Sequence, residues 1–224
     1  TAATLNRVKN ESDAETGGGA GSPIHRAIRA FLRANKSAKV WAVPVTATSG
    51  GSPATATAVL TIATTATGTG TISVNIAGEE CQATFPTGST PTQIGALVEA
   101  TVNAKTFLPC TASNATGTVT FTAKVAGTSQ GTATIGVHRV RVSITSGVGT
   151  TASFGGAFLG TGVAGAEGST TEAANTLTAL NVISARRFYY LVSSAISSTT
   201  LAHFKSHLVT KSEPRQGLRS VAIA

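Results

Sequence analysis

The chain has 224 residues, 41% of them hydrophobic, which is enough for one large domain or two small ones, each with its own core. No apolar run approaches the roughly 20 residues that span a bilayer. The net charge of +8 and the pI of about 10.1 would suit nucleic-acid binding, but aromatic residues are only 5% of the chain and no Lys/Arg cluster alternates with them. We therefore expect neither a membrane-spanning protein nor a nucleic-acid-binding one.

The chain begins with a polar segment followed by glycines. Thr1–Thr16 is expected to be a surface loop or the frayed remainder of an earlier element, because it is charged and lacks apolar periodicity. Gly17–Gly21 leads into a helix and so offers backbone N–H groups to an anion. A nucleotide-binding loop should follow a strand and end in Lys-Ser/Thr, however, and neither feature is present. A flexible connector is the preferred interpretation.

The next two elements are a helix and a strand. Ser22 as N-cap and Pro23 at the first helical position predict a helix that ends near Asn35. Its apolar residues lie on one stripe: Ile24, Ile28, Phe31 and Leu32. Lys39–Val45 is mostly apolar, which is typical of a strand covered on both faces in a parallel sheet. Pro44 cannot donate to a strand ladder and marks an edge or the end of the pairing.

A Thr/Gly/Ala-rich block follows and has a different period. Thr71–Ile76, Thr118–Ala123 and Arg139–Ile144 alternate apolar and polar residues, which predicts half-buried strands. Ala77–Glu80 is predicted to be the turn between two paired strands. A capping box at Thr90–Gln93 opens one helix, whose stripe consists of Ile94, Leu97, Val98 and Val102. We expect a thin sandwich or open barrel with one helix across it.

Helix and strand signals return after a glycine-rich linker, Gly147–Gly168. A second capping box at Ser169–Glu172 predicts a helix that reaches Ser184. Arg187–Val192 is a second buried-strand signal. A third helix carries Leu201, Phe204 and Leu208 in line, and Ser220–Ala224 is predicted to be a strand.

These elements predict one domain interrupted by another. Residues 1–48 and 149–224 are expected to form a discontinuous α/β core domain, with a mixed, mainly parallel sheet and flanking helices. Residues 49–148 are expected to form an inserted β-rich domain with one helix, similar to a β-sandwich or barrel. The core carries 13 basic and 6 acidic residues and the insertion 4 and 3. A basic core of this kind could face acidic surfaces on copies of itself.

No set of residues predicts catalysis, a cofactor or a metal. His203 and His207 share a helix face at zinc-ligand spacing, but no Glu follows His203 and no third ligand stands out. Glu79 and Glu80 are adjacent, so their side chains diverge, whereas acid–base catalysis needs converging carboxylates. The serines lack a GxSxG elbow. We expect no enzyme activity, no catalytic, cofactor-binding or metal-binding residues, and no small-molecule substrate.

Cysteines, arginines and aromatic residues have structural interpretations as well as functional ones. Cys81 and Cys110 are interpreted as small buried residues of strands, and a disulfide would require those strands to be neighbours. Arg186 and Arg187 either solvate the start of a strand or form salt bridges with a neighbouring subunit. Packing in the core or on a sheet face is preferred to a ligand site for the aromatic residues, which are Trp41, Tyr189 and Tyr190.

Several segments together resemble the contractile tail sheath proteins of Mu-like bacteriophages. The front of the family's core resembles Gly21–Arg26 through Trp41–Val45. The family's inserted β-domain is similar to four segments taken in order, which are Gly70–Gly78, Thr90–Asn103, Leu108–Ala112 and Gly117–Gly127. The family's return into the core resembles Ala185–Tyr190 and Gln216–Ala222. The resemblance follows the family's order over nearly the whole chain and corresponds to its middle domains. The family's N-terminal arm and C-terminal domain are expected to be missing from this sequence.

The resemblance implies a non-catalytic structural subunit of the virion tail, assembled in the cytoplasm of the host bacterium. It would polymerise helically around the tail tube and contract to drive the tube through the host envelope. The implied partners are copies of itself, the tube protein, and baseplate and tail terminator proteins, with no nucleic acid. The alternative is a secreted or surface β-rich adhesin or interaction module, which the Thr/Gly-rich strands alone would favour.

Overall fold

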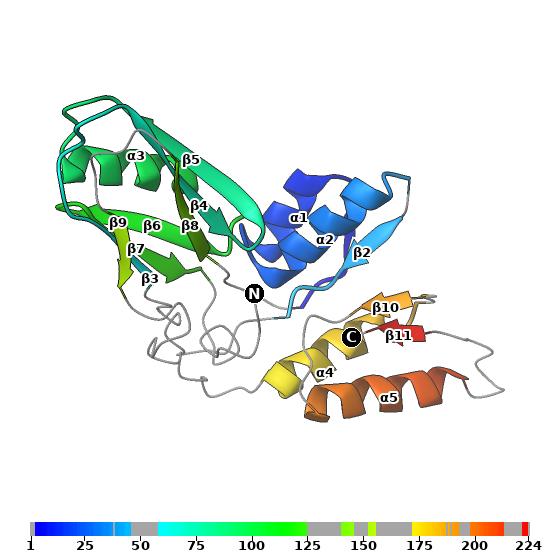
Figure 1. Cartoon of the computed structure of the whole chain (residues 1–224). Coiled ribbons are helices and arrows are strands. Elements are labelled where there is room, and N and C mark those ends of the chain that lie inside the picture. Colours follow the sequence, from blue (N-terminus) through cyan, green and yellow to red (C-terminus); the bar gives the residue numbers. More distant parts are fainter. Residues whose placement is uncertain are drawn as a thin grey trace. The chain divides into compact units, whose positions relative to one another are not determined.

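The computed structural model describes residues 3–37, 39–45, 58–124, 140–145, 152–155, 172–186, 188, 190–192, 198–212 and 221–223. The chain divides into two compact units (Figure 1). We call Thr1–Gly50 with Glu167–Ala224 the discontinuous unit and Gly51–Ala166 the inserted unit. The predicted return into the core at residue 149 is too early, because the inserted unit still contains a strand at Ala152–Gly155.

The first half of the discontinuous unit packs two helices on a two-stranded sheet. Strand β1 (Asn6–Val8) pairs antiparallel with β2 (Val40–Ala42), and helices α1 (Glu11–Gly18) and α2 (Pro23–Ala34) connect them. Their small core consists of Val8, Ala14 and Ile28, with Ile24, Leu32, Val40 and Ala42 packed against it. Helix α2 begins as predicted, because the Ser22 side chain accepts from the His25 N–H.

The expectation that Thr1–Thr16 is a surface loop or the frayed remainder of an earlier element is wrong for its described part, which contains β1 and most of α1. Helix α1 forms there because the Asn10 side chain caps it, accepting from the Asp13 N–H at 2.8 Å. The Asp13 carboxylate in turn accepts from the Lys9 N–H at 2.9 Å. Strand β1 has only three residues, too few for an apolar period to be visible in the sequence.

The second half of the discontinuous unit contains α4 (Glu172–Ile183), α5 (Ser198–Ser212) and a parallel strand pair. Strand β10 (Tyr190–Val192) lies beside β11 (Val221–Ile223), with Leu191 opposite Ala222. A second core forms around Leu180, Ile183 and Phe204, and the residues packed against it are Leu5, Val43, Phe188 and Leu191. Leu5 and Val43 thus attach the β1–β2 region to α4 and α5.

The prediction of a mainly parallel sheet with flanking helices is wrong. Among the described residues, β10 and β11 form the one parallel pair, and the strands of the other sheets are antiparallel. The apolar run at Val40–Val45 does give a strand, but its partner is β1, from the segment expected to be a loop. An apolar run predicts burial and says nothing of which strand pairs with which, because pairing depends on contacts distant in sequence.

The inserted unit consists of two antiparallel sheets and one helix. The four-stranded sheet has the order β6-β7-β3-β9, with β6 at Cys110–Ala115, β7 at Thr118–Ala123, β3 at Ala58–Ile62 and β9 at Ala152–Gly155. The three-stranded sheet has the order β5-β4-β8, with β5 at Glu79–Phe85, β4 at Gly70–Ile76 and β8 at Val140–Thr145. Helix α3 (Pro91–Asn103) contacts both sheets.

The predicted capping box and alternating strands of the inserted unit are confirmed. The Thr90 hydroxyl accepts from the Gln93 N–H and the Gln93 side chain accepts from the Thr90 N–H. Apolar residues of both sheets and of α3 share one core of seventeen buried residues, which includes Leu60, Ile72, Phe85 and Phe121. Alternation places these residues on the inner face and threonines on the outer one.

Two tight hairpins in the described part of the inserted unit have the same turn geometry. Ala77–Gly78 joins β4 to β5 and Thr116–Gly117 joins β6 to β7, with positive φ at all four residues. In each turn an asparagine three residues before the glycine accepts the glycine N–H, at 3.1 Å for Asn75 and 3.2 Å for Asn114. Two successive positive φ angles match the twist of paired strands, so each turn sets the register of its hairpin.

Candidate assembly surface

Exposed apolar side chains are concentrated on the discontinuous unit. Ten large hydrophobic side chains are exposed in the described part of the chain, and nine of them belong to this unit. They are Phe31, Trp41, Val45, Leu177, Val182, Tyr190, Val192, Leu201 and Val209. The tenth, Leu97 on α3 of the inserted unit, is 39% exposed. The prediction that Leu97 belongs to the buried stripe of this helix is therefore wrong. Contiguous exposed apolar residues are typical of a surface that contacts another protein, so neighbouring members of this set on one face are the ones that bear on assembly.

The face of β10 that points away from the helices is the most exposed part of this set. Leu191 packs on the core of α4 and α5, so its neighbours Tyr190 and Val192 lie on the opposite face by strand alternation. These two side chains are 72% and 70% exposed. Parallel strands are normally covered on both faces, so the open β10 face, defined by Tyr190 and Val192, lacks a layer among the described residues.

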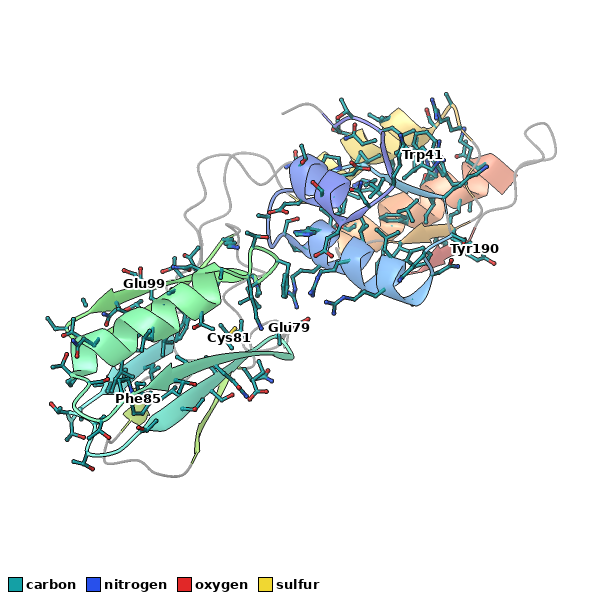
Figure 2. The ribbon with its side chains drawn as sticks, turned by 90° about the horizontal axis from the view of Figure 1, so that it is seen from above. Trp41, Glu79, Cys81, Phe85, Glu99 and Tyr190 are labelled. Atoms are coloured by element: carbon teal, nitrogen blue, oxygen red, sulfur yellow. The ribbon has the colours of Figure 1, made fainter. Side chains whose placement is uncertain are left out.

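A second aromatic residue lies on β2 of the same unit. Val40 and Ala42 pack inward, and Trp41 between them is 37% exposed. The Arg186 guanidinium lies over the Trp41 ring, 4.8 Å from its centroid, and is itself exposed. Figure 2 labels Trp41 and Tyr190 on this unit. Trp, Tyr and Arg are the residue types that most often dominate binding energy at protein interfaces.

The residues considered for catalysis or metal binding lie on two elements, α5 and β5. His203 and His207 both lie on α5, where burial, with Lys211 nearby, lowers the pKa of His207. No three His, Cys, Asp or Glu side chains of the described residues are placed to share a metal ion. Glu79 and Glu80 lie in β5 rather than in the turn, and a hydrogen bond from Ser73 lowers the pKa of Glu80.

The glycine-rich loop before α2 is an ordered connection between two helices. The Gly19 N–H donates to the Glu15 carbonyl at 2.9 Å, and the Gly21 N–H donates to His25 Nδ1 at 3.1 Å. His25 is buried, and its Nε2 lies 3.8 Å from Glu11, which also pairs with Arg29. These N–H groups bond within the protein, and the loop follows a helix rather than the strand that a phosphate site requires.

The two cysteines lie on different sheets. Cys81 is in β5 and Cys110 is in β6, and both are buried and free. Burial raises the pKa of the Cys81 thiol. Several predictions fall outside the described residues. Among the arginines and aromatic residues considered above, Arg187 and Tyr189 are not described. The same holds for Arg139, for the linker at 147–151 and 156–168, and for residues 169–171 of the second capping box.

Within the described part of the chain, none of the helices is long and apolar enough to cross a membrane. Comparison with known proteins finds no matching family model and no matching curated protein.

Proposed function

We propose that this chain is a structural subunit of a contractile bacteriophage tail sheath, which polymerises helically around the tail tube. The observation that carries the proposal is the concentration of exposed apolar side chains on the discontinuous unit. In this proposal the discontinuous unit contacts neighbouring subunits and the inserted unit is a displayed lobe. The resemblance of the segments around Trp41 and Tyr190 to the sheath family supports the same assignment.

Core size supports this division of roles. The inserted unit buries seventeen residues in one hydrophobic core, whereas each of the two cores of the discontinuous unit contains three, counted over the described residues. A unit with small cores and exposed apolar residues gains more stability from partner contacts than a unit whose apolar residues are already buried.

Charge also differs between the units. The discontinuous unit carries 13 basic and 6 acidic residues, and the inserted unit carries 4 and 3. An excess of positive charge requires acidic complements on the surfaces it contacts. Copies related by one rotation and one rise would form an open helical polymer, in which a patch on one subunit contacts a different patch on the next. Contraction would then be a choice between two packings of rigid units.

The proposal is tested by comparing two charge substitutions at exposed apolar positions. Sedimentation velocity and negative-stain electron microscopy over a concentration series should show the parent chain forming ring-like or helical polymers. Val192→Asp on the open β10 face should prevent them, because association would bury a carboxylate. Leu97→Asp, on the inserted unit, is the matched control and should polymerise like the parent.

The outcomes separate the proposed function from its alternatives. A parent chain that sediments as a monomer at every concentration would count against the sheath assignment and favour a display or adhesion module. Equal loss of polymers in both variants would show that general solubility, and not the β10 face, controls association.

A further inference from the structure

Helix α3 lies along the edge strand β6 of the inserted unit and bonds to its outward backbone groups. Strand β6 pairs with β7 on one side, and no other described strand pairs with it. On its free side, Asn103 bonds both backbone groups of Ala112, donating from Nδ2 to the carbonyl and accepting the N–H at Oδ1, each at 2.9 Å. An asparagine side chain bonded in this way occupies the positions that an added strand would use.

Further contacts extend this arrangement along β6. The Glu99 carboxylate accepts the backbone N–H of Asn114 at 3.0 Å, two residues from Ala112 and therefore on the same edge. The Asn114 side chain donates to the carbonyl of Thr92 at 3.0 Å. Figure 2 labels Glu99 on the helix. Three outward backbone groups of β6 are thus bonded to side chains of α3.

The helix is built for close approach to this edge. At 100° per residue, Thr92, Glu99 and Asn103 lie within roughly 40° of one another on the helix surface, and the buried stripe of Ile94, Val98 and Val102 is centred about 120° away. Gly95 lies between the two stripes, and a Cβ there would be 2.2 Å from Asn114 Oδ1. One stripe therefore packs into the core while the other faces the strand edge.

The segment after the helix also reaches the outer strand of the second sheet. Lys105 follows the C-terminus of α3, and its ammonium group donates to the backbone carbonyl of Glu80 in β5. Strand β5 pairs with β4 alone among the described strands. The helix and Lys105, which follows its C-cap, thus provide hydrogen-bond partners for backbone groups of the edge strands of both sheets.

We infer that α3 is a built-in guard that prevents strand addition at the β6 edge, through the side chains of Asn103 and Glu99. Unpaired edges pair readily with strands of other chains, and a covering helix is one way in which proteins prevent this. With the guard removed, β6 pairs with β6 of a second copy, which offers the same unpaired backbone groups. This inference does not depend on the proposed function, since it concerns the inserted unit alone.

The test combines a guard variant with a reporter of edge pairing in the full chain. Glu99→Leu/Asn103→Leu removes the side-chain bonds to β6 and keeps good helix formers. Ser113→Cys, exposed on β6 between Ala112 and Asn114, forms an intermolecular disulfide when two β6 edges pair antiparallel. We expect the amides of Ala112 and Asn114 to exchange hydrogen about tenfold faster in the guard variant, the change expected for one lost hydrogen bond. Disulfide dimers should form faster by a similar factor.

Controls separate edge exposure from loss of stability. Ile72→Val weakens the shared core from β4 and leaves the α3 side chains that bond to β6 unchanged. It should leave the exchange rates of the two amides and the rate of cross-linking as they are in the chain that carries Ser113→Cys alone. Glu99→Gln keeps an acceptor for the Asn114 N–H and should behave like the parent. If the double variant does not fold, Asn103→Asp, which cannot donate to the Ala112 carbonyl, replaces it.

The inference would be overturned by either of two results. The first is unchanged protection of the Ala112 and Asn114 amides in the guard variant, which would mean that the side-chain bonds do not control access to the edge. The second is faster exchange without faster cross-linking, which would mean that an open β6 edge does not pair with another copy.

Discussion

At the residue scale, single contacts explain choices that local propensity would not make. Gly95 lies in the middle of α3, where glycine is about 1 kcal/mol less favourable than alanine. The Asn114 side chain occupies the space that a Cβ would need, and it also accepts the Gly117 N–H of the hairpin turn. Gly95 in the helix is therefore required by the side chain of Asn114, nineteen residues later in the sequence, which supports the hairpin turn at Thr116–Gly117.

Gly95→Ala should destabilise the inserted unit by about 2 kcal/mol, since the cost of overpacking and of displacing Asn114 exceeds the gain in helix propensity. Urea unfolding followed by circular dichroism measures this difference. In an Asn114→Ala background the obstacle is absent, so the same substitution should become neutral or stabilising. A stabilising effect of Gly95→Ala in the parent chain would contradict the close approach of helix and strand.

At the element scale, helix α5 contains a titratable residue, His207, whose environment changes its pKa. Burial, and next the charge of Lys211, lower the pKa of His207 from its ordinary 6.5. The unfolded chain then binds a proton more readily than the folded one, so stability is full above pH 6.5 and is lost as the pH falls toward the folded-state pKa.

We therefore expect the discontinuous unit to lose stability as the pH falls below 6.5, and His207→Gln to reduce this dependence. Thermal unfolding at a series of pH values, followed by tryptophan fluorescence of Trp41, measures the effect. His203→Gln, one turn earlier on the same helix, controls for the loss of an imidazole. A pH dependence identical in the parent and the His207→Gln variant would show that His207 is not its source.

At the scale of the whole molecule, the two units differ in how much of their apolar surface they bury. Among the described residues, the inserted unit has one core of seventeen buried residues, and α3 bonds to the edge of β6. The described part of the discontinuous unit has two cores of three buried residues and the open β10 face. Because hydrophobic stabilisation scales with buried apolar area, the two units should differ in stability.

Scanning calorimetry should accordingly show two transitions, with the discontinuous unit unfolding at the lower temperature. Phe204→Leu, in the core of α4 and α5, should lower the first transition, and Phe121→Leu, in the inserted core, the second, each by roughly 1–2 kcal/mol of stability. One transition that moves with either substitution would mean that the units unfold together.

Local patterns in the sequence were sufficient to predict individual elements. The Ser22 and Thr90 caps, the strands at Thr71–Ile76 and Thr118–Ala123 and the helix through Phe204 are confirmed, because caps and periodicity act over a few residues. The polar stripe of Thr92, Glu99 and Asn103 is also visible in the sequence as spacings of seven and four. Its target is not, because β6 lies in a later part of the chain.

What the sequence determined by itself is therefore the type of most elements and the division of charge and composition along the chain. Only the tertiary structure decided that β2 pairs antiparallel with β1, that β10 leaves Tyr190 and Val192 uncovered, and that α3 bonds to the edge of β6. The reason is physical: propensity and capping are local, whereas strand pairing and burial depend on contacts between residues far apart in sequence.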